Sequence, residues 1–135
     1  MAHWLLKSEP SAYSWSQLVK DKHTSWTGVR NPQAQLNLKA MKAGDRCFFY
    51  HSGEGKEIVG IVEIIKPYYP DPSDLTGKFG MVDVRAVGAL KKPVSLDAVK
   101  ADPRLAKMAL VTNARLSVQP VTPEEWNYIL KLGGS

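Results

Sequence analysis

One run of ten residues, 57–66, restricts the possible folds more than any other part of the chain. It reads Glu-Ile-Val-Gly-Ile-Val-Glu-Ile-Ile-Lys, so that β-branched residues fall on both faces of an extended strand. A strand that is apolar on both faces lies in the middle of a sheet and is covered on each side. Gly60 inside the run predicts a bulge or a bend, as a strongly curved sheet requires. We therefore expect a small curved sheet or open barrel.

The other predicted strands are short and are not separated by regular helical crossovers. They lie at residues 3–7, 45–51, 81–87 and 115–121, and the prolines at 67, 70 and 72 are expected to end the central strand. Too few helices alternate with these strands for a parallel sheet. The pattern predicts an α+β fold, in which a curved sheet carries helices on its outside.

Three local patterns predict where helices begin. Ser14-Trp15-Ser16-Gln17 and Thr122-Pro123-Glu124-Glu125 have the spacing of capping boxes. Asn31 followed by Pro32 fits an N-cap and a first helical position, and Gly44 is expected to end that helix. Shorter helical pieces are predicted at 95–100 and 102–108, and residues 21–30 are predicted to form a polar loop.

The length and the single cysteine bound the class of protein. A chain of 135 residues fits one domain, which we expect to span residues 1–135. Cys47 lies in an apolar run and is expected to be buried, and a lone cysteine excludes an intramolecular disulfide. Because no signal peptide pattern or membrane-length apolar run is present, we expect an intracellular, cytoplasmic protein, associated with the nucleoid if it binds DNA.

The positive charge is concentrated in the first part of the chain. Residues 1–52 hold seven Lys or Arg against three Asp or Glu, whereas residues 53–135 hold eleven against ten. This asymmetry indicates a polyanionic partner such as nucleic acid. The alternative is a basic surface that is merely solvated, and charge alone leaves both open.

Most catalytic and metal-dependent chemistries lack support in the sequence. The three histidines, His3, His23 and His51, do not have zinc-ligand spacing, and we expect no metal and no cofactor. His51 and Ser52 are neighbours, and neighbouring residues of a strand point to opposite faces. Neither a nucleophile elbow nor a phosphate-binding glycine loop is present. We therefore expect no catalytic residues.

The segment Trp26-Thr27-Gly28-Val29-Arg30-Asn31-Pro32-Gln33 is the most informative for function. It is a loop that leads into a helix N-terminus, where free N–H groups favour anions. Trp26 offers a flat apolar face, Gly28 permits close backbone approach, and Arg30 adds a positive charge. Together they would suit a nucleotide. The alternative is that Trp26 fills the core and Arg30 pairs with an acid.

Segments along nearly the whole chain resemble the signature of the EVE domain family. The clearest are Trp4-Leu5-Leu6-Lys7-Ser8-Glu9-Pro10 and the stretch 26–34; the others are 49–52, 59–61, 69–72 and 115–122. The resemblance implies a PUA-like fold, a curved β pseudo-barrel with short peripheral helices. It also implies a reader of modified bases, with methylated or hydroxymethylated cytosine in DNA as the leading candidate and no catalytic activity.

The resemblance places a base-binding pocket between three segments. The candidate residues are Lys7, Ser8, Glu9, Trp26, Gly28, Val29, Arg30, Asn31, Tyr50, His51 and Ser52. A base flipped out of the duplex would stack on Trp26, polar groups of Ser8, Asn31 or His51 would hold its edge, and Lys7 and Arg30 would neutralise phosphate.

The chain departs from the family pattern in two places, and other functions stay open. Gln35 stands where many relatives have an arginine, and the segment 73–80 is shorter than in many relatives.

Three alternatives to a reader of modified DNA stay open. They are a module for modified RNA, an enzyme on nucleoside-like ligands that uses His51 with Glu9 or Lys7, and a simple interaction scaffold. Any protein effector partner is not indicated by the sequence.

Overall fold

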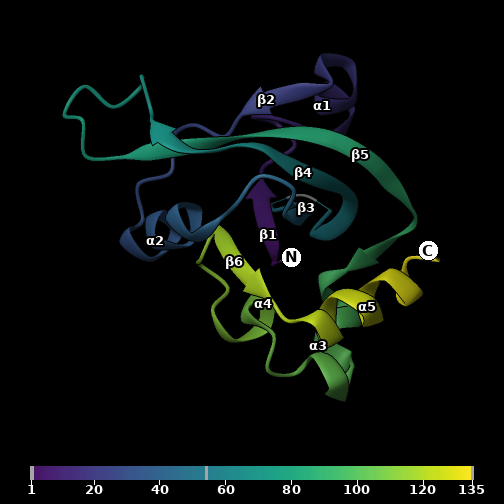
Figure 1. The fold of residues 1–135 in the computed structure, drawn as a ribbon. Coiled ribbons are helices and arrows are strands. Elements are labelled where there is room, and N and C mark those ends of the chain that lie inside the picture. The colour runs from purple at the N-terminus through teal and green to yellow at the C-terminus, as the bar shows by residue number, and fades with distance from the viewer. Residues whose placement is uncertain (1, 54, 135) are drawn as a thin grey trace.

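The computed structural model describes residues 2–53 and 55–134. Within them, one six-stranded sheet has the order β2-β5-β4-β3-β1-β6 (Figure 1). Its strands are β1 (His3–Ser8), β2 (His23–Ser25), β3 (Arg46–His51), β4 (Glu57–Pro70), β5 (Gly80–Ser95) and β6 (Val118–Val121). β1 pairs with β3 in parallel, and the other neighbouring pairs are antiparallel. The sheet is curved and open, which confirms the predicted α+β fold.

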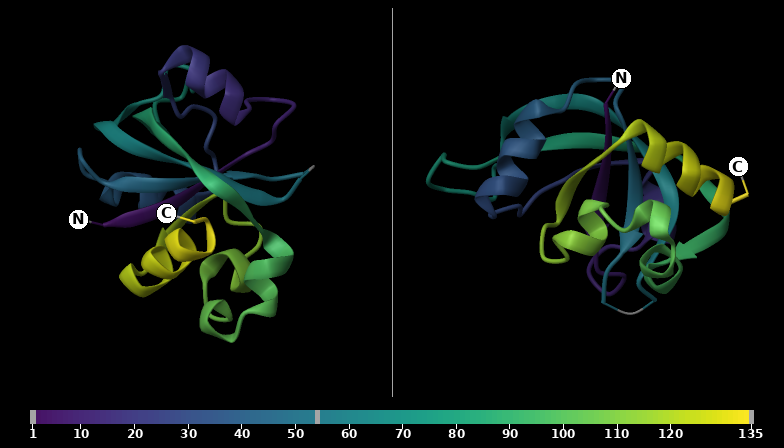
Figure 2. Two further views of the ribbon diagram at one scale, coloured as in Figure 1. Left: turned by 90° about the vertical axis from the view of Figure 1, so that its right-hand side faces the viewer. Right: turned by 90° about the horizontal axis from the view of Figure 1, so that it is seen from below.

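Helices cover both sides of the sheet. They are α1 (Trp15–Asp21), α2 (Pro32–Ala40), α3 (Leu96–Ala101), the 3₁₀ turn η1 (Pro103–Leu105), α4 (Ala109–Thr112) and α5 (Pro123–Leu132). The last three α-helices lie together on one side of the sheet, and α1 lies on the opposite side (Figure 2). The predicted N-caps at Ser14 and Asn31 and the capping box at Thr122 are confirmed. The box predicted at Ser14 is incomplete, because the Gln17 side chain bonds Asp21 instead of the Ser14 backbone.

The central strand has the position and the irregularity that its sequence predicts. β4 lies between β3 and β5, and its pairing with β5 shifts register between Ile58 and Gly60. A Cβ atom at position 60 would come within 2.5 Å of the Trp15 ring. Glycine is therefore needed because the ring of Trp15 packs directly on the strand.

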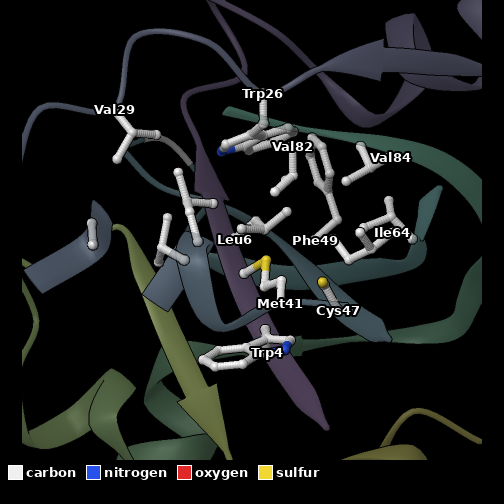
Figure 3. Packing of buried hydrophobic residues seen from close by; sticks show 14 of the residues in the cluster. Trp4, Leu6, Trp26, Val29, Met41, Cys47, Phe49, Ile64, Val82 and Val84 are labelled. Atoms are coloured by element: carbon white, nitrogen blue, oxygen red, sulfur yellow. The ribbon is translucent and has the colours of Figure 1, made fainter. Parts of the chain in front are cut away.

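Two hydrophobic clusters lie on the two faces of the sheet. Neighbouring residues alternate between them: Leu6 and Phe49 belong to the first cluster, and Leu5 and Phe48 belong to the second. The first cluster includes Trp26, Met41 and Cys47 (Figure 3). Burial of Cys47 is confirmed. Burial of the central strand on both faces is confirmed only in part, because alternate residues of β4 from Ile58 to Ile64 are buried, those between them are half-buried, and Ile65 is 43% exposed.

Several strand boundaries differ from the prediction. β4 continues to Pro70, because Pro67 lies beyond the last β3 partner of β4 and inside a register shift, where a missing N–H is tolerated. β5 is much longer than 81–87, and β6 begins at Val118 rather than at residue 115. β2 was predicted as loop, since a three-residue strand has no periodicity of its own.

Two helix predictions are also wrong. α2 ends at Ala40 rather than at Gly44, because Met41 already has extended backbone angles. The helix predicted at 102–108 is only the turn η1, and α4 was not predicted. No helix within the described residues has the length and apolar character that crossing a membrane requires.

Candidate functional site

A cleft of about 520 Å³ opens where β1 ends, which is a volume typical of ligand sites. We call it the β1-end cleft. Its lining comprises Lys7, Ser8, Glu9, Ala12, Tyr13, Thr24, Ser25, Trp26, Thr27, Gly28, Val29, Arg30 and Ser117. The Lys7 backbone N–H donates to Ser117 O within the lining, and Trp26 N donates to Val82 O, which attaches the Trp26 segment to β5. Seven of the predicted site residues therefore share one cleft.

Trp26 belongs both to the core and to the cleft. Its side chain is only 8% exposed and meets the Phe49 ring edge-on, with centroids 5.7 Å apart. Figure 3 shows Trp26 and Val29 at the same end of the first cluster, with Trp4 at the opposite end. The expectation that Trp26 fills the core is thus confirmed, and the same residue also lines the cleft.

Arg30 is held by the residues 71–79, which we call the 71–79 loop. Its Nη1 lies 3.4 Å from Asp71 Oδ2, its Nη2 donates to Ser73 Oγ at 3.2 Å, and its guanidinium lies over the Phe79 ring. The expectation that Arg30 pairs with an acid is therefore confirmed. The side chain nevertheless stays 40% exposed, so its charge is accessible at the edge of the cleft.

Asp71 joins this loop to the cleft wall. Its buried carboxylate accepts hydrogen bonds from Gly28 N at 2.9 Å and from the backbone and hydroxyl of Ser73. Burial by itself would raise the pKa of Asp71, but these hydrogen bonds and that from Arg30 outweigh it and lower the pKa. The ionised carboxylate thus fixes the backbone of the Trp26 segment at Gly28.

Lys7 supplies a second cation, and Ser8 supplies a hydroxyl. Lys7 Nζ donates to Ala114 O and lies 5.7 Å from the centroid of the Tyr50 ring, and burial lowers the pKa of this lysine. Ser8 Oγ donates to Tyr13 O at 2.6 Å, so its lone pairs stay available to accept a bond from a ligand. The cleft therefore combines an apolar wall with cationic and polar groups.

Four predicted site residues do not line the β1-end cleft: Asn31, Tyr50, His51 and Ser52. The Asn31 side chain caps α2, and Tyr50 is buried in the second cluster. His51 Nε2 accepts from Trp15 N at 3.0 Å, and Ser52 lines a smaller hollow beside Glu9. The backbone of Ser52 does meet β1, since its N–H donates to Ser8 O. The segments meet as predicted, but none of these four residues belongs to the lining of the cleft.

Six residues of the lining were not predicted from the sequence: Ala12, Tyr13, Thr24, Ser25, Thr27 and Ser117. Thr24 and Ser25 belong to β2, which is held in place by pairing with Val84 and Asp83 of β5. Such long-range pairing leaves no local signal. Thr27 could have been included, because it lies inside the segment that had been singled out.

Gln35 faces the interior rather than the cleft. It is 5% exposed, and its amide nitrogen donates to Val29 O at 2.7 Å and to Gly80 O at 3.0 Å. Its amide oxygen accepts from Tyr68 Oη and from Gly80 N. Gln35 therefore supports both the Trp26 segment and the end of the 71–79 loop from the interior of the protein.

Acidification should weaken the attachment of α1 through His51. Burial lowers the pKa of His51, and only the neutral Nε2 can accept the hydrogen bond from Trp15 N. The stabilisation is present above the unfolded pKa of about 6.5 and is lost as pH falls from there through the lowered folded pKa. We expect urea unfolding to show a larger loss of stability between pH 7.5 and pH 5.5 in the wild type than in His51→Gln. Equal losses would contradict this role.

Comparisons with known proteins agree on one family. The model of the EVE domain matches residues 2–132. Thymocyte nuclear protein 1 of Rattus norvegicus is 38% identical to this chain over 164 residues, which cover 96% of the chain and 73% of the relative. The NMR structure of Rpa0253 from Rhodopseudomonas palustris is 60% identical, with a TM-score of 0.95 and coverage of 99% of this chain and 94% of that one.

Two further solved structures are complexes with methylated nucleic acid. Human THYN1 protein, in complex with 5-methylcytosine containing DNA, is 35% identical, with a TM-score of 0.92 and coverage of 100% of this chain and 99% of that one. The YTH domain of Zygosaccharomyces rouxii MRB1 protein, in complex with N6-methyladenosine RNA, is 18% identical, with a TM-score of 0.62 and coverage of 98% and 86%. The second likeness concerns the fold alone, and it agrees with the PUA-like architecture.

Proposed function

Because the chain belongs to the EVE domain family, we propose that it binds nucleic acid and reads a modified base, a methylated or hydroxymethylated cytosine in DNA. One observation carries the proposal. Trp26 and two residues with cationic side chains, Lys7 and Arg30, line the β1-end cleft, in a fold that matches the DNA-bound human protein over the whole chain. The aromatic wall suits a base, and the cations suit its phosphates.

Base flipping would bring the modified cytosine into the cleft. Extrusion from a duplex costs a few kcal/mol, and stacking on an aromatic side chain returns about 1–3 kcal/mol per base. Burying one methyl group against Val29 and Trp26 adds only about 0.8 kcal/mol, or about a fourfold preference. Stronger discrimination requires hydrogen bonds from groups such as Ser8, or exclusion of the wrong base.

The proposal is for binding without turnover. The enzyme alternative required His51 together with Glu9 or Lys7 as acid and base. Among the described residues, no histidine lines the cleft, and His51 Nε2 is already bonded to Trp15 N. Free modified nucleosides incubated with the protein should therefore be recovered unchanged.

The test is a fluorescence-polarisation titration at fixed salt with DNA and RNA duplexes that carry one central cytosine, unmodified, methylated or hydroxymethylated. Ala12 is exposed at the cleft, so Ala12→Trp should obstruct the cleft without disturbing the core. Ala106 is exposed beside η1, and Ala106→Trp is the matched control. We expect a modified-base preference of about tenfold or more, about 1.4 kcal/mol, in the wild type and in the control, and its loss in Ala12→Trp.

One outcome would reject this function, and another would reject only the β1-end cleft as its site. Equal and salt-sensitive binding of every duplex would mean that only a basic surface is present. Preference for the modified base that survives Ala12→Trp would mean that the base is held elsewhere. A preference restricted to the RNA duplexes would replace DNA by RNA as the target.

A further inference from the structure

The tip of the 71–79 loop carries the most exposed large hydrophobic side chain of the described residues. Leu75 is 97% exposed, whereas the next such residue, Leu36, is 57% exposed. Figure 1 shows the connection between β4 and β5 projecting beyond the body of the sheet. A leucine that is almost completely exposed contributes nothing to the core, and single exposed leucines are common. Leu75 differs from such residues because the loop around it is ordered by hydrogen bonds and is attached to the edge of the β1-end cleft.

The loop holds Leu75 in a preformed position. Asp74 Oδ1 accepts from the backbone N and the hydroxyl of Thr76, and Asp74 Oδ2 accepts from Phe79 N at 2.7 Å. These bonds, above all that from the Thr76 hydroxyl, lower the pKa of Asp74 to about 2. Both carboxylate oxygens are thus directed at the loop's own donors, on either side of the apolar tip. The backbone that carries Leu75 is therefore ordered before binding, so the loop itself loses little freedom when it binds.

The same loop is attached to the edge of the β1-end cleft. Asp71 is bonded to Gly28 N, and Ser73 is bonded to Arg30 Nη2. Leu75 follows Ser73 by two residues, so its Cα lies within about 7 Å of that of Ser73. The apolar tip therefore stands beside the cleft, next to a cation that faces solvent.

We propose that Leu75 is a wedge that enters the base stack of a duplex at the place that the flipped base leaves. This inference rests on the proposed function. Extruding a base leaves a gap that exposes the faces of its neighbours, and proteins that distort duplexes insert apolar side chains between base steps. Filling the gap with Leu75 offsets part of the cost of unpairing.

The occupant of this tip is a duplex rather than a protein surface. The flanking side chains of the loop are polar or charged: Ser73, Asp74, Thr76 and Lys78. One leucine among them provides far less than the roughly 800 Å² per partner of a stable protein interface. A single apolar side chain does match a single base step. Arg30 and Lys78 supply positive charge for the phosphates, and the opposing carboxylates of Asp71 and Asp74 are bonded to donors of the protein itself.

The experiment compares one modified cytosine in a duplex and in the single strand of the same sequence. A single strand has no stack to open, so a wedge contributes only to binding of the duplex. We expect Leu75→Ala to weaken duplex binding by about tenfold, about 1.4 kcal/mol, and to leave single-strand binding unchanged. A 2-aminopurine placed next to the target should brighten less on binding Leu75→Ala than on binding the wild type. Leu36→Ala, on the exposed face of α2, is the control and should change neither affinity.

Each other outcome overturns the wedge. Unchanged duplex affinity in Leu75→Ala, with the wild-type base preference intact, rejects the wedge and leaves the proposed function standing. Equal weakening of duplex and single strand shows that the loop contacts the strand without entering the stack. A wild type that binds all strands alike rejects the proposed function and the wedge together.

Discussion

Replacing Gln35 by leucine is expected to lower the free energy of unfolding by about 3–5 kcal/mol, because buried polar groups that lose their partners cost about 1–3 kcal/mol each. The variant leaves Val29 O, Gly80 O and Gly80 N without the amide that they bond, and it deprives Tyr68 Oη of its acceptor. Leucine has a similar size, so the loss comes from polar desolvation rather than from a cavity. Urea unfolding followed by tryptophan fluorescence measures it.

The matched control is Gln33→Leu, two residues earlier on the same helix. Gln33 is exposed, and its amide makes one long contact, 3.4 Å, to Asn37. We expect a change within about 0.5 kcal/mol there. Similar losses in the two variants would show that helix propensity, and not the buried amide, determines the effect. We also expect the folded Gln35→Leu protein to bind DNA more weakly than the wild type does. The side-chain amide of Gln35 bonds Val29 and Gly80 and so supports the cleft wall and the end of the 71–79 loop.

Local signals predicted the helix starts, whereas boundaries that depend on distant partners were missed. Ser14, Asn31 and Thr122 each accept a hydrogen bond from a backbone N–H three residues away. Their capping role can therefore be predicted from a short stretch of sequence. Pro67 was expected to end a strand, but its effect depends on whether β3 still runs beside β4 at that point. The short β2 exists only because β5 lies next to it.

In the candidate site, too, local features were predicted and features that depend on distant partners were not. The segments that meet at the β1-end cleft were predicted, because they contain unusual runs of residues. The directions of the side chains at the end of β3 were not. Strict alternation sends Phe49 to the first cluster and Tyr50 to the second, and a register shift lies between these two residues. Which face of β3 meets the cleft depends on the whole sheet, and a local motif cannot specify it.

Trp26 connects stability and binding most directly, so its replacement is expected to affect both. Trp26→Ala should lower the free energy of unfolding by about 3–5 kcal/mol, because a large buried side chain is removed from beside Phe49. It should also abolish the preference for a modified base. Loss of binding by this variant alone would not separate the two causes, since a protein that does not fold cannot bind.

Trp26→Phe separates them. A phenylalanine keeps an aromatic ring near Phe49 and costs about 1–2 kcal/mol, but it presents a smaller surface in the cleft. If the base stacks on Trp26, we expect affinity for the modified duplex to fall about tenfold, within the 1–3 kcal/mol that such stacking supplies. Trp126→Phe is the control, because Trp126 stacks on Phe48 in the second cluster, away from the cleft. It should lose a similar amount of stability and bind like the wild type. If both phenylalanine variants bind like the wild type, Trp26 only fills the core, and the base must contact another part of the cleft.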